Sequence, residues 1–232
     1  MSCWRVVFGG ASDAGEQMAL DDALAREAGP AVRVFTWNPP AVSLGLKQPR
    51  PAWLDAGRWR AAGLELVERP TGGGLAVHGS DCSIAVVVPR EAAIPLDAVM
   101  SSVCQSAVRL CRSYGVEADA IVEAPGARRV TYCLTEPSPY AVMSASRKLA
   151  GFALRRYPQS WLIQGSLLVG AVPAPLAAAM PDDARRQFEA RAIALSEAAG
   201  RSMRPQDVAK RWGTSWAMWW DELLVSELVD AV

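Results

Sequence analysis

Residues 68–89 read E-R-P-T-G-G-G-L-A-V-H-G-S-D-C-S-I-A-V-V-V-P, and the rest of the chain is organised around them. Short runs rich in branched apolar residues, at 64–67 and 84–88, are typical of buried strands. Arg69 and His78, the only histidine in the chain, lie between these runs together with a glycine cluster. The cluster consists of Gly72, Gly73 and Gly74. Successive glycines allow positive φ angles and close approach of a ligand to backbone N–H groups. The segment therefore predicts either a ligand-binding loop or a simple hairpin turn.

The composition is that of a folded globular protein. Of 232 residues, 51% are hydrophobic and 21% are charged, which argues against disorder. The 24 basic and 24 acidic residues cancel, so no long-range field favours nucleic acid or a membrane as a partner. The length fits one large domain with a small appendage. We expect a core over residues 1–170 and a helical C-terminal extension over 171–232 packed on the same domain.

The five cysteines are odd in number, and none forms a C-x-x-C motif. With a single histidine in the chain there is no zinc constellation either, so we expect no metal. The start of the chain lacks the apolar segment of a secretion signal, and no run approaches membrane-spanning length. These features predict a cytoplasmic protein with free thiols.

Periodicity and turn residues predict a chain of short strands and helices. The expected strands cover residues 4–8, 32–37, 41–44, 64–67, 84–88, 130–134, 140–143, 148–154 and 161–169. The expected helices cover residues 11–29, 51–62, 95–114, 174–179, 182–199, 205–212 and 221–229. An Asn-Pro-Pro turn at 38–40 is expected to join strands 32–37 and 41–44 into a hairpin, because proline cannot sit inside a central ladder.

Most cysteines and the clustered tryptophans are expected in structural roles. Cys104 and Cys111 lie seven residues apart on one face of the expected helix 95–114, where free cysteine behaves as a small hydrophobe. Cys82, in the strand after His78, has the same interpretation. Three tryptophans cluster before the last expected helix, and such a cluster more often docks a chain end onto a core than binds a ligand. These are Trp216, Trp219 and Trp220.

Unlike the other cysteines, Cys133 lies in a sequence pattern that, together with Lys148, is compatible with a catalytic role. Cys133 precedes Pro137 and Pro139 at the end of an expected strand, and Lys148 follows fifteen residues later in K-L-A-G-F-A. A thiolate nucleophile needs a lowered pKa, which a nearby ammonium or oriented backbone dipoles can supply. A lysine in apolar surroundings can instead hold a carbonyl or phosphate oxygen. From the residues alone, Cys133 is either a nucleophile or a core thiol.

Several ordered motifs resemble the biotin/lipoate protein ligase and transferase superfamily, specifically its lipoate-protein ligases and octanoyltransferases. They are L-D-D-A-L, V-F-T-W-N-P-P-A-V-S-L-G, R-P-T-G-G-G-L-A-V-H, R-K-L-A-G-F-A and I-Q-G-S-L-L, between residues 18 and 168. The resemblance implies an α/β (α+β) fold of the class II biotin/lipoyl-ligase-like catalytic domain. In that fold a mixed, mostly antiparallel sheet is packed with helices, and an apolar acyl tunnel lies beside the glycine loop.

The resemblance also implies roles for the candidate site residues. Cys133 would be the nucleophile, and Lys148 would hold the acyl carbonyl and favour the thiolate. Arg69 would hold an anionic group such as pantetheine or adenylate phosphate. The three glycines and His78 would line the acyl pocket. The other expected substrate-binding residues are Gly151, Ala153 and Gln164.

Three functions stay open. Residues 133–140 resemble the C-x-x-x-P-S-x-Y element of cysteine-dependent octanoyltransferases, which implies octanoyl transfer from acyl carrier protein, through a Cys133 thioester, to a lysine of a lipoyl-domain protein. Gly74 favours an ATP-dependent lipoate-protein ligase that uses Mg and acts through lipoyl-AMP, because the transferases often have arginine there. A second subunit would then supply the accessory domain. The third function is a non-catalytic subunit that binds a lipoyl domain. No tightly bound cofactor is expected, only the octanoyl or lipoyl group as substrate.

Three residues depart from the family pattern. Gly79 follows His78 where an acidic residue is usual, and Gln164 stands where a histidine often precedes G-S. Phe152 replaces a small serine. Each departure is expected to reshape the pocket, and Phe152 is expected to shorten it.

Overall fold

The computed structural model describes residues 4–123 and 132–230 and is built on a seven-stranded sheet. Its strands run in the order β1-β2-β6-β10-β9-β8-β7. They cover Arg5–Ser12 (β1), Ala31–Trp37 (β2), Asp81–Pro89 (β6), Ser160–Leu168 (β10), Arg147–Arg156 (β9), Tyr140–Ser144 (β8) and Asp119–Val122 (β7). Only β1 and β2 pair in parallel, and the other neighbours are antiparallel. The predicted mixed, mostly antiparallel sheet is confirmed.

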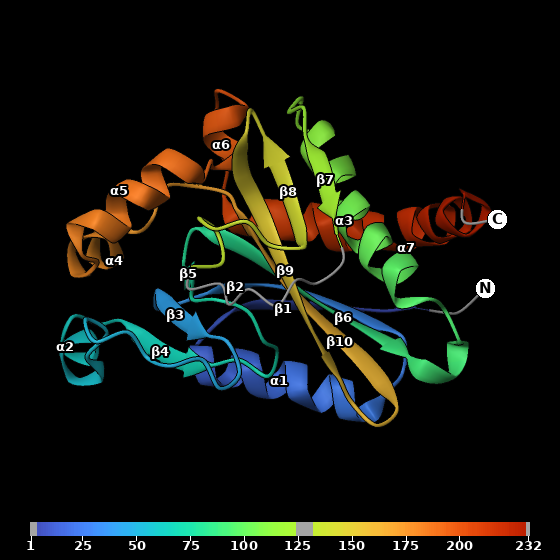
Figure 1. Ribbon diagram of the computed structural model, residues 1–232, viewed down its shortest axis with the longest axis horizontal. Helices are drawn as coiled ribbons and strands as arrows, with labels where there is room; N and C mark the ends of the chain where they lie inside the picture. Colours follow the sequence, from blue (N-terminus) through green and yellow to red (C-terminus); the bar gives the residue numbers. More distant parts are fainter. Residues whose placement is uncertain (1–3, 124–131, 231–232) are drawn as a thin grey trace.

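A second, three-stranded sheet has the order β4-β3-β5, and Figure 1 shows it at the left end of the large sheet. Its strands cover Glu65–Glu68 (β4), Ala41–Leu44 (β3) and Ala76–His78 (β5). β3 pairs in parallel with β4 and antiparallel with β5. The short helix α2 (Ala56–Ala61) connects β3 to β4, and the Asp55 side chain caps it by accepting the Arg58 N–H.

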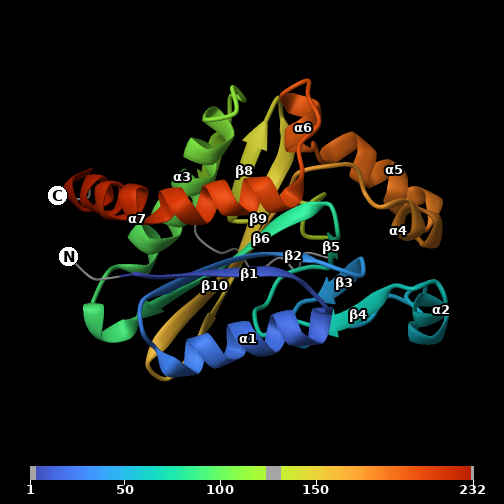
Figure 2. The ribbon, with the colours of Figure 1, turned by 180° about the vertical axis from the view of Figure 1, so that it is seen from behind.

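Helices cover both faces of the large sheet (Figures 1 and 2). Helix α1 (Ala14–Glu27) lies on one face against β2, β6 and β10, and the Asp13 side chain caps its N-terminus. Helices α3 (Leu96–Arg112) and α7 (Pro205–Asp230) lie together on the opposite face. The remaining helices, α4 (Ala174–Ala179), α5 (Asp182–Arg191) and α6 (Leu195–Ala198), form the connection from β10 to α7, and a 3₁₀ turn η1 (Arg90–Ala92) follows β6.

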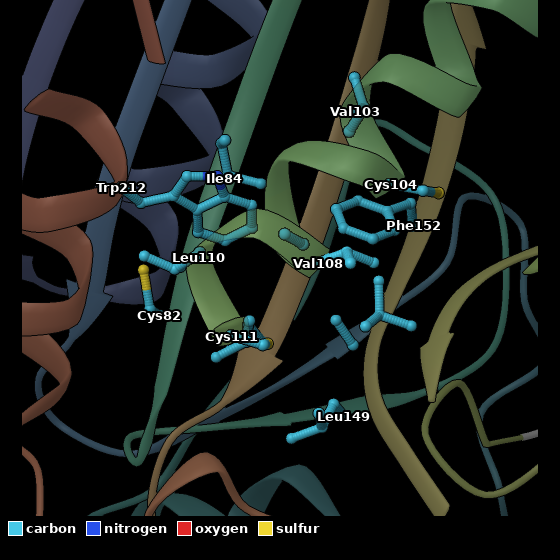
Figure 3. Packing of buried hydrophobic residues seen from close by; sticks show 14 of the residues in the cluster. Cys82, Ile84, Val103, Cys104, Val108, Leu110, Cys111, Leu149, Phe152 and Trp212 are labelled. Carbon is cyan, nitrogen blue, oxygen red and sulfur yellow. The ribbon is translucent and has the colours of Figure 1, made fainter. Parts of the chain in front are cut away.

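The main core lies between the large sheet and the helices α3 and α7. Cys82, Cys104 and Cys111 are all fully buried in it, which confirms their structural interpretation. Figure 3 shows Phe152 in this core beside Val108 and Cys104 of α3. The Phe152 ring therefore lies on the face of the large sheet that packs against α3 and α7. The prediction that this ring shortens a ligand pocket is wrong.

The expected hairpin between residues 32–37 and 41–44 is wrong, because β2 and β3 belong to different sheets. The Asn38 N–H still donates to Ser12 O, in the β1–β2 pairing, at 3.1 Å. Pro40 O already accepts the Glu65 N–H of β4 at 3.1 Å. The prolines therefore carry the chain from one sheet into the other. The glycine loop connects β4 to β5, which lie on opposite sides of β3 in the small sheet, so it is not a simple hairpin turn either.

The expected helix 182–199 is broken, and two expected helices near the C-terminus are one. After α5 the chain becomes extended because the Ile193 N–H donates to Lys148 O of β9 at 3.0 Å. Helix α7 runs unbroken through the tryptophan cluster. Trp212, Trp216 and Trp220 recur every fourth residue and are at most 2% exposed, so they form one buried helix face. The predicted role of the cluster, to dock the end of the chain onto the core, is confirmed for its two buried members, Trp216 and Trp220.

Smaller differences concern element ends. Residues 51–55 are not helical, and α2 starts only at its Asp55 cap. Residues 130 and 131 of the expected strand 130–134 lie outside the described residues, while the part from Cys133 onward is a turn. The strands β5 and β7 were not expected, because each has only three or four residues and little alternation of apolar and polar side chains.

Gly165 in β10 is expected to be intolerant of a side chain. A Cβ there would lie 2.3 Å from Phe152 Cδ1 and 3.2 Å from Ile84 Cγ2, inside a packed core. We expect Gly165→Ala to lower the free energy of unfolding by about 2–3 kcal/mol, as overpacking does. Urea unfolding measures the loss. Gly29→Ala is the matched control, since a Cβ at Gly29 meets no atom within 4 Å; equal effects of the two variants would contradict the packing argument.

Candidate active site

A small pocket, partly open to solvent, lies where the two sheets meet. Alternate residues of the antiparallel pair β9–β10 form its floor, because Gly151 faces Ser166 and Ala153 faces Gln164 across the ladder. Its other walls come from α1, β2, β3, β5, β6 and the turn before β8. The lining residues are Met18, Phe35, Trp37, Ser43, Arg69, Ala76, His78, Ser83, Ile84, Cys133, Gly151, Ala153, Gln164, Gly165 and Ser166.

Cys133 is the only cysteine among the pocket-lining residues, and it is half-buried. A Cβ added to Gly151 would lie 3.0 Å from Cys133 Sγ and 3.5 Å from Lys148 Cε. Glycine at 151 therefore allows the sulfur to approach the backbone of β9 closely. The turn that carries Cys133 is tied to β5, because the Cys133 N–H donates to Leu75 O at 2.8 Å.

Lys148 is buried beneath this turn and holds it in place. Its ammonium donates to Cys133 O at 2.6 Å, to Glu136 O at 3.0 Å and to Ser138 Oγ at 2.6 Å. An ammonium has three N–H donors, so these bonds use all of them. Burial lowers the pKa of Lys148, and the opposing charges of Cys133 and Glu136 raise it by less. The Lys148 side chain is thus desolvated, and burial disfavours its charged form.

The buried Arg69 side chain donates hydrogen bonds to carbonyls of the glycine loop. Its Nη2 donates to Gly72 O and Gly74 O, both at 2.7 Å, and its Nη1 donates to Ser43 O and Ser43 Oγ, both at 3.2 Å. Gly73 has a φ of +91°, and a Cβ there would lie 2.9 Å from Nη2. The loop therefore needs glycine at 73 to close around the guanidinium. Burial lowers the pKa of Arg69, while the charge of Cys133 raises it, so the two groups lie within electrostatic reach.

His78 lies between a carboxylate and a hydroxyl. Its Nδ1 lies 2.8 Å from Asp81 Oδ2 and its Nε2 lies 2.8 Å from Ser43 Oγ. The ring stacks on Trp37 with 4.0 Å between the ring centres. Burial raises the pKa of Asp81, but the charge and hydrogen bond of His78 and a hydrogen bond from Ser166 outweigh it and lower that pKa overall. The acidic residue that the family pattern places directly after the histidine is therefore supplied two positions later, by Asp81.

Gln164 connects the glycine loop to a buried ion pair. Its side-chain carbonyl accepts the Thr71 hydroxyl at 2.7 Å, and its Nε2 donates to Asp21 Oδ2 at 2.7 Å. Asp21 also pairs with Arg33, and both side chains are at most 1% exposed. The Arg33 guanidinium is shared with Gln17, to which it also donates. Asp21, the first aspartate of L-D-D-A-L, is thus connected to the glycine-loop residue Thr71 through Gln164.

Asp21 is expected to make stability depend on pH. Burial raises its pKa from 3.8 to about 6, against the lowering effect of Arg33 and Gln164. A folded-state pKa above the unfolded value means that the native state binds the proton more tightly, so stability falls as pH rises from about 4 to about 6. The asparagine variant cannot titrate there. The stability advantage of the wild type over Asp21→Asn should therefore shrink across this window, and Asp183→Asn, at an exposed acid on α5, should show no such trend. Urea unfolding at several pH values tests this, and a growing advantage would contradict the direction.

The pocket brings together most of the predicted site residues. Six of them line it: Arg69, His78, Cys133, Gly151, Ala153 and Gln164. The three loop glycines contact Arg69 or lie beside it, and Lys148 contacts the turn of Cys133. The roles of all these residues stay predictions. Sequence reasoning missed Ser43 and Asp21 although both lie in quoted motifs, and it missed Asp81 because nothing in the chain order shows that its carboxylate reaches His78.

A glycine loop, a thiol and a buried lysine around one pocket, on a mixed sheet packed with helices, define a catalytic domain that transfers or ligates acyl groups. The chain belongs to the family of the lipoyl protein ligase A/B catalytic domain, whose model matches residues 13–217. This confirms the resemblance drawn from the motifs and the assignment of the chain as an enzyme.

The similar curated proteins are octanoyltransferases. The octanoyltransferase LipM of Kyrpidia tusciae is 31% identical, with 86% of this chain and 81% of that protein covered. The octanoyltransferase LipM of Symbiobacterium thermophilum is 32% identical, with 85% of this chain and 79% of that protein covered. The identities extend over most of both chains, so they concern the whole domain.

The similar solved structures are ligases. A lipoate-protein ligase A bound with ATP superposes with a TM-score of 0.71 at 19% identity, covering 92% of this chain and 85% of that one. A bi-partite lipoate protein ligase from Thermoplasma acidophilum superposes with a TM-score of 0.63 at 20% identity, covering 91% of this chain and 84% of that one. At these identities the likeness establishes the fold alone. Within the described residues, no helix is both long and apolar enough to cross a membrane.

Proposed function

We propose that the chain transfers an octanoyl group from acyl carrier protein to the lysine of a lipoyl-domain protein through a thioester on Cys133. The observation that carries the proposal is the position of Cys133, whose sulfur lines the pocket against Gly151 while Lys148 holds the turn that bears it. Sequence similarity to octanoyltransferases over most of the chain supports the same reaction. The domain boundary near residue 170 and a cytoplasmic location belong to this proposal.

Cys133 lies near two buried cationic side chains. The charge of Cys133 acts on both Arg69 and Lys148, so two buried cations lie within reach of the sulfur. Neighbouring cations stabilise the thiolate, which is the nucleophilic form of cysteine. The thiolate attacks the carbonyl carbon of the acyl carrier thioester, a new C–S bond forms, and the carrier thiolate leaves. The acceptor lysine then attacks the enzyme thioester, an amide forms, and Cys133 is released.

At their terminal nitrogens, Arg69 and Lys148 do not present free donors to a substrate. Four bonds from Arg69 and three from Lys148 go to oxygens of the protein itself. Either residue must therefore exchange an internal bond for one to substrate, or act by charge and by shaping the pocket. Ser138 Oγ is the readiest of the Lys148 partners to exchange, because a hydroxyl can rotate whereas the two backbone carbonyls are held by the turn.

Intact mass spectrometry tests the proposal. The purified chain is incubated with octanoyl-acyl carrier protein, and we expect a single octanoyl adduct that hydroxylamine removes. Addition of a lipoyl-domain protein should transfer the adduct to that protein without ATP. If no adduct forms but free lipoate and ATP modify the lipoyl domain, the thioester mechanism is refuted.

The second candidate is an ATP-dependent lipoate-protein ligase that acts through lipoyl-AMP. Gly74 favours it, because the cysteine-dependent transferases often have arginine at that position. The Thermoplasma acidophilum ligase of similar fold is bi-partite, which supports a second subunit for this candidate. In such a ligase ATP, with Mg, is a substrate. If neither reaction occurs with the chain alone, both assays are repeated with candidate partner chains before a non-catalytic binding role is accepted.

A further inference from the structure

We propose that Ser43, His78 and Asp81 form a proton-accepting relay that serves the second half of the reaction, in which the acceptor amine attacks the Cys133 thioester. The inference rests on the proposed transfer function and adds a base to it. Ser43 and His78 line the same pocket as Cys133, and Asp81 lies behind them at the start of β6.

The hydrogen bonds of Asp81 determine which nitrogen of His78 carries the proton. Asp81 is fully buried and accepts four hydrogen bonds: from Gly79 N at 3.0 Å, Ser83 Oγ at 2.9 Å, Ser166 Oγ at 2.7 Å and His78 Nδ1 at 2.8 Å. An ionised carboxylate only accepts, so Nδ1 of His78 must be the donor. In a neutral imidazole Nε2 is then the acceptor, and the Ser43 hydroxyl donates to it at 2.8 Å.

Ser43 has one lone pair left for a substrate. Its oxygen donates its proton to His78 and accepts one bond from Arg69 Nη1 at 3.2 Å. A hydroxyl oxygen has two lone pairs, so the second is available to an N–H group in the pocket. The Asp–His–hydroxyl order is the arrangement by which a carboxylate orients an imidazole so that it takes a proton through a hydroxyl.

The imidazole is held rigidly in this orientation. The Trp37 ring stacks on it at an angle of 18°, and Trp37 Nε1 donates to Ser83 Oγ at 2.9 Å, which in turn donates to Asp81. The ring therefore cannot turn without breaking hydrogen bonds on both sides. The charged groups around it are Asp81 on one side and Arg69, through Ser43, on the other.

As an ammonium bonded to the protein, Lys148 is not arranged to accept a proton in this pocket. An ammonium has no lone pair, and all three of its N–H groups are bonded to the turn of residues 133–138. Among the described residues that line the pocket, His78 is the only side chain that ordinarily gains and loses a proton near neutral pH. Arg69 stays protonated at all working pH values.

The proposed step balances as follows. The acceptor ammonium first loses one proton to solvent. The neutral amine attacks the thioester carbonyl carbon and forms the C–N bond, while a second proton passes from nitrogen to Ser43 Oγ and the Ser43 proton passes to His78 Nε2. The C–S bond then breaks, Cys133 leaves as thiolate, and Asp81 stabilises the imidazolium. Loss of the imidazolium proton and protonation of the thiolate leave an amide and a free thiol.

A single-turnover experiment on preloaded enzyme tests the relay. Wild type and His78→Gln are first loaded to completion with octanoyl-acyl carrier protein, and the transfer to a lipoyl-domain protein is followed by mass spectrometry from about pH 5.5 to 9. We expect His78→Gln to form the thioester but to transfer it about 10²–10³-fold more slowly. The pH dependence of the transfer rate should differ between the wild type and the variant, because the variant lacks the base.

Two further variants separate a relay from a purely structural role. Asp81→Asn should slow transfer at least about tenfold, and Ser43→Ala should do the same, each with the loaded thioester intact. Ser102→Ala is the matched control, because it removes a buried serine hydroxyl in α3 that has no hydrogen-bond partner. It should leave transfer unchanged.

The outcomes distinguish the relay from the function on which it rests. If wild type forms no thioester, the transfer function fails. If thioester forms and His78→Gln transfers it at the wild-type rate with an unchanged pH profile, the relay is refuted while the transferase stands. If His78→Gln does not fold, the pH profile of transfer by Asp81→Asn decides: a changed profile supports the relay, and an unchanged one refutes it.

Discussion

Cys133→Ala is expected to abolish transfer from octanoyl-acyl carrier protein, with a loss of at least about 10⁴-fold in rate, because no other cysteine among the described residues lines the pocket. The half-buried side chain touches Gly151 at the pocket wall, so its loss should change stability little. The octanoyl adduct seen on the wild type by mass spectrometry should be absent. Ligase activity with free lipoate and ATP, if present at all, should survive the substitution.

Two controls sharpen the result. Cys104→Ala removes a fully buried core thiol, so it should cost stability yet leave the adduct in place. Cys133→Ser should at most form an oxygen ester, which resists the neutral hydroxylamine that cleaves a thioester. An adduct of unchanged amount and lability on Cys133→Ala would show that the acyl group is carried elsewhere.

Lys148→Met should be the second large effect, and it should remove activity on either the transferase or the ligase mechanism. The substitution keeps most of the side-chain length but removes three hydrogen bonds that hold the turn of Cys133. The backbone carbonyls of Cys133 and Glu136 then lose the Lys148 ammonium as a donor, which costs free energy because both bonds are partly buried. We expect at least about a 10³-fold loss of transfer rate.

The measurement pairs a rate with a probe of the turn. Limited proteolysis or hydrogen exchange over residues 132–138 should show faster opening in Lys148→Met than in the wild type. Lys210→Met is the matched control, since Lys210 lies on an exposed part of α7. A fully active Lys148→Met enzyme would overturn both catalytic assignments, whereas a loss of rate with an unchanged turn would indicate that Lys148 acts on substrate directly.

The candidate site was predictable where it depends on short contiguous motifs. Arg69, the glycine loop and His78 lie within ten residues, and the turn geometry that needs glycine is local. Cys133 and Lys148 were identified from the motifs around them, the prolines after Cys133 and the sequence K-L-A-G-F-A. The hydrogen-bond partners of these side chains could not be predicted from the sequence. Arg69 donates to carbonyls of its own glycine loop, and Lys148 donates to the turn that carries Cys133.

The pairing between strands could not be predicted from the sequence. Residues 32–37 and 41–44 are both strands, and 64–67 and 84–88 largely coincide with β4 and β6, yet neither pair forms a hairpin. A strand pattern shows which face is buried but carries no information about its hydrogen-bonding neighbour. The broken helix after α5 has the same cause, because the competing hydrogen bond comes from Lys148 O, far away in the chain.

By itself, the sequence determined the family through its ordered motifs, and the resemblance implied the mostly antiparallel fold and several of the residues at the pocket. Only the tertiary structure decided that Phe152 faces α3, that Asp81 replaces the missing acid beside His78, and that Asp21 reaches the glycine loop through Gln164. Each of these depends on which distant strands and helices come together. That choice follows from packing the whole core and not from any one segment.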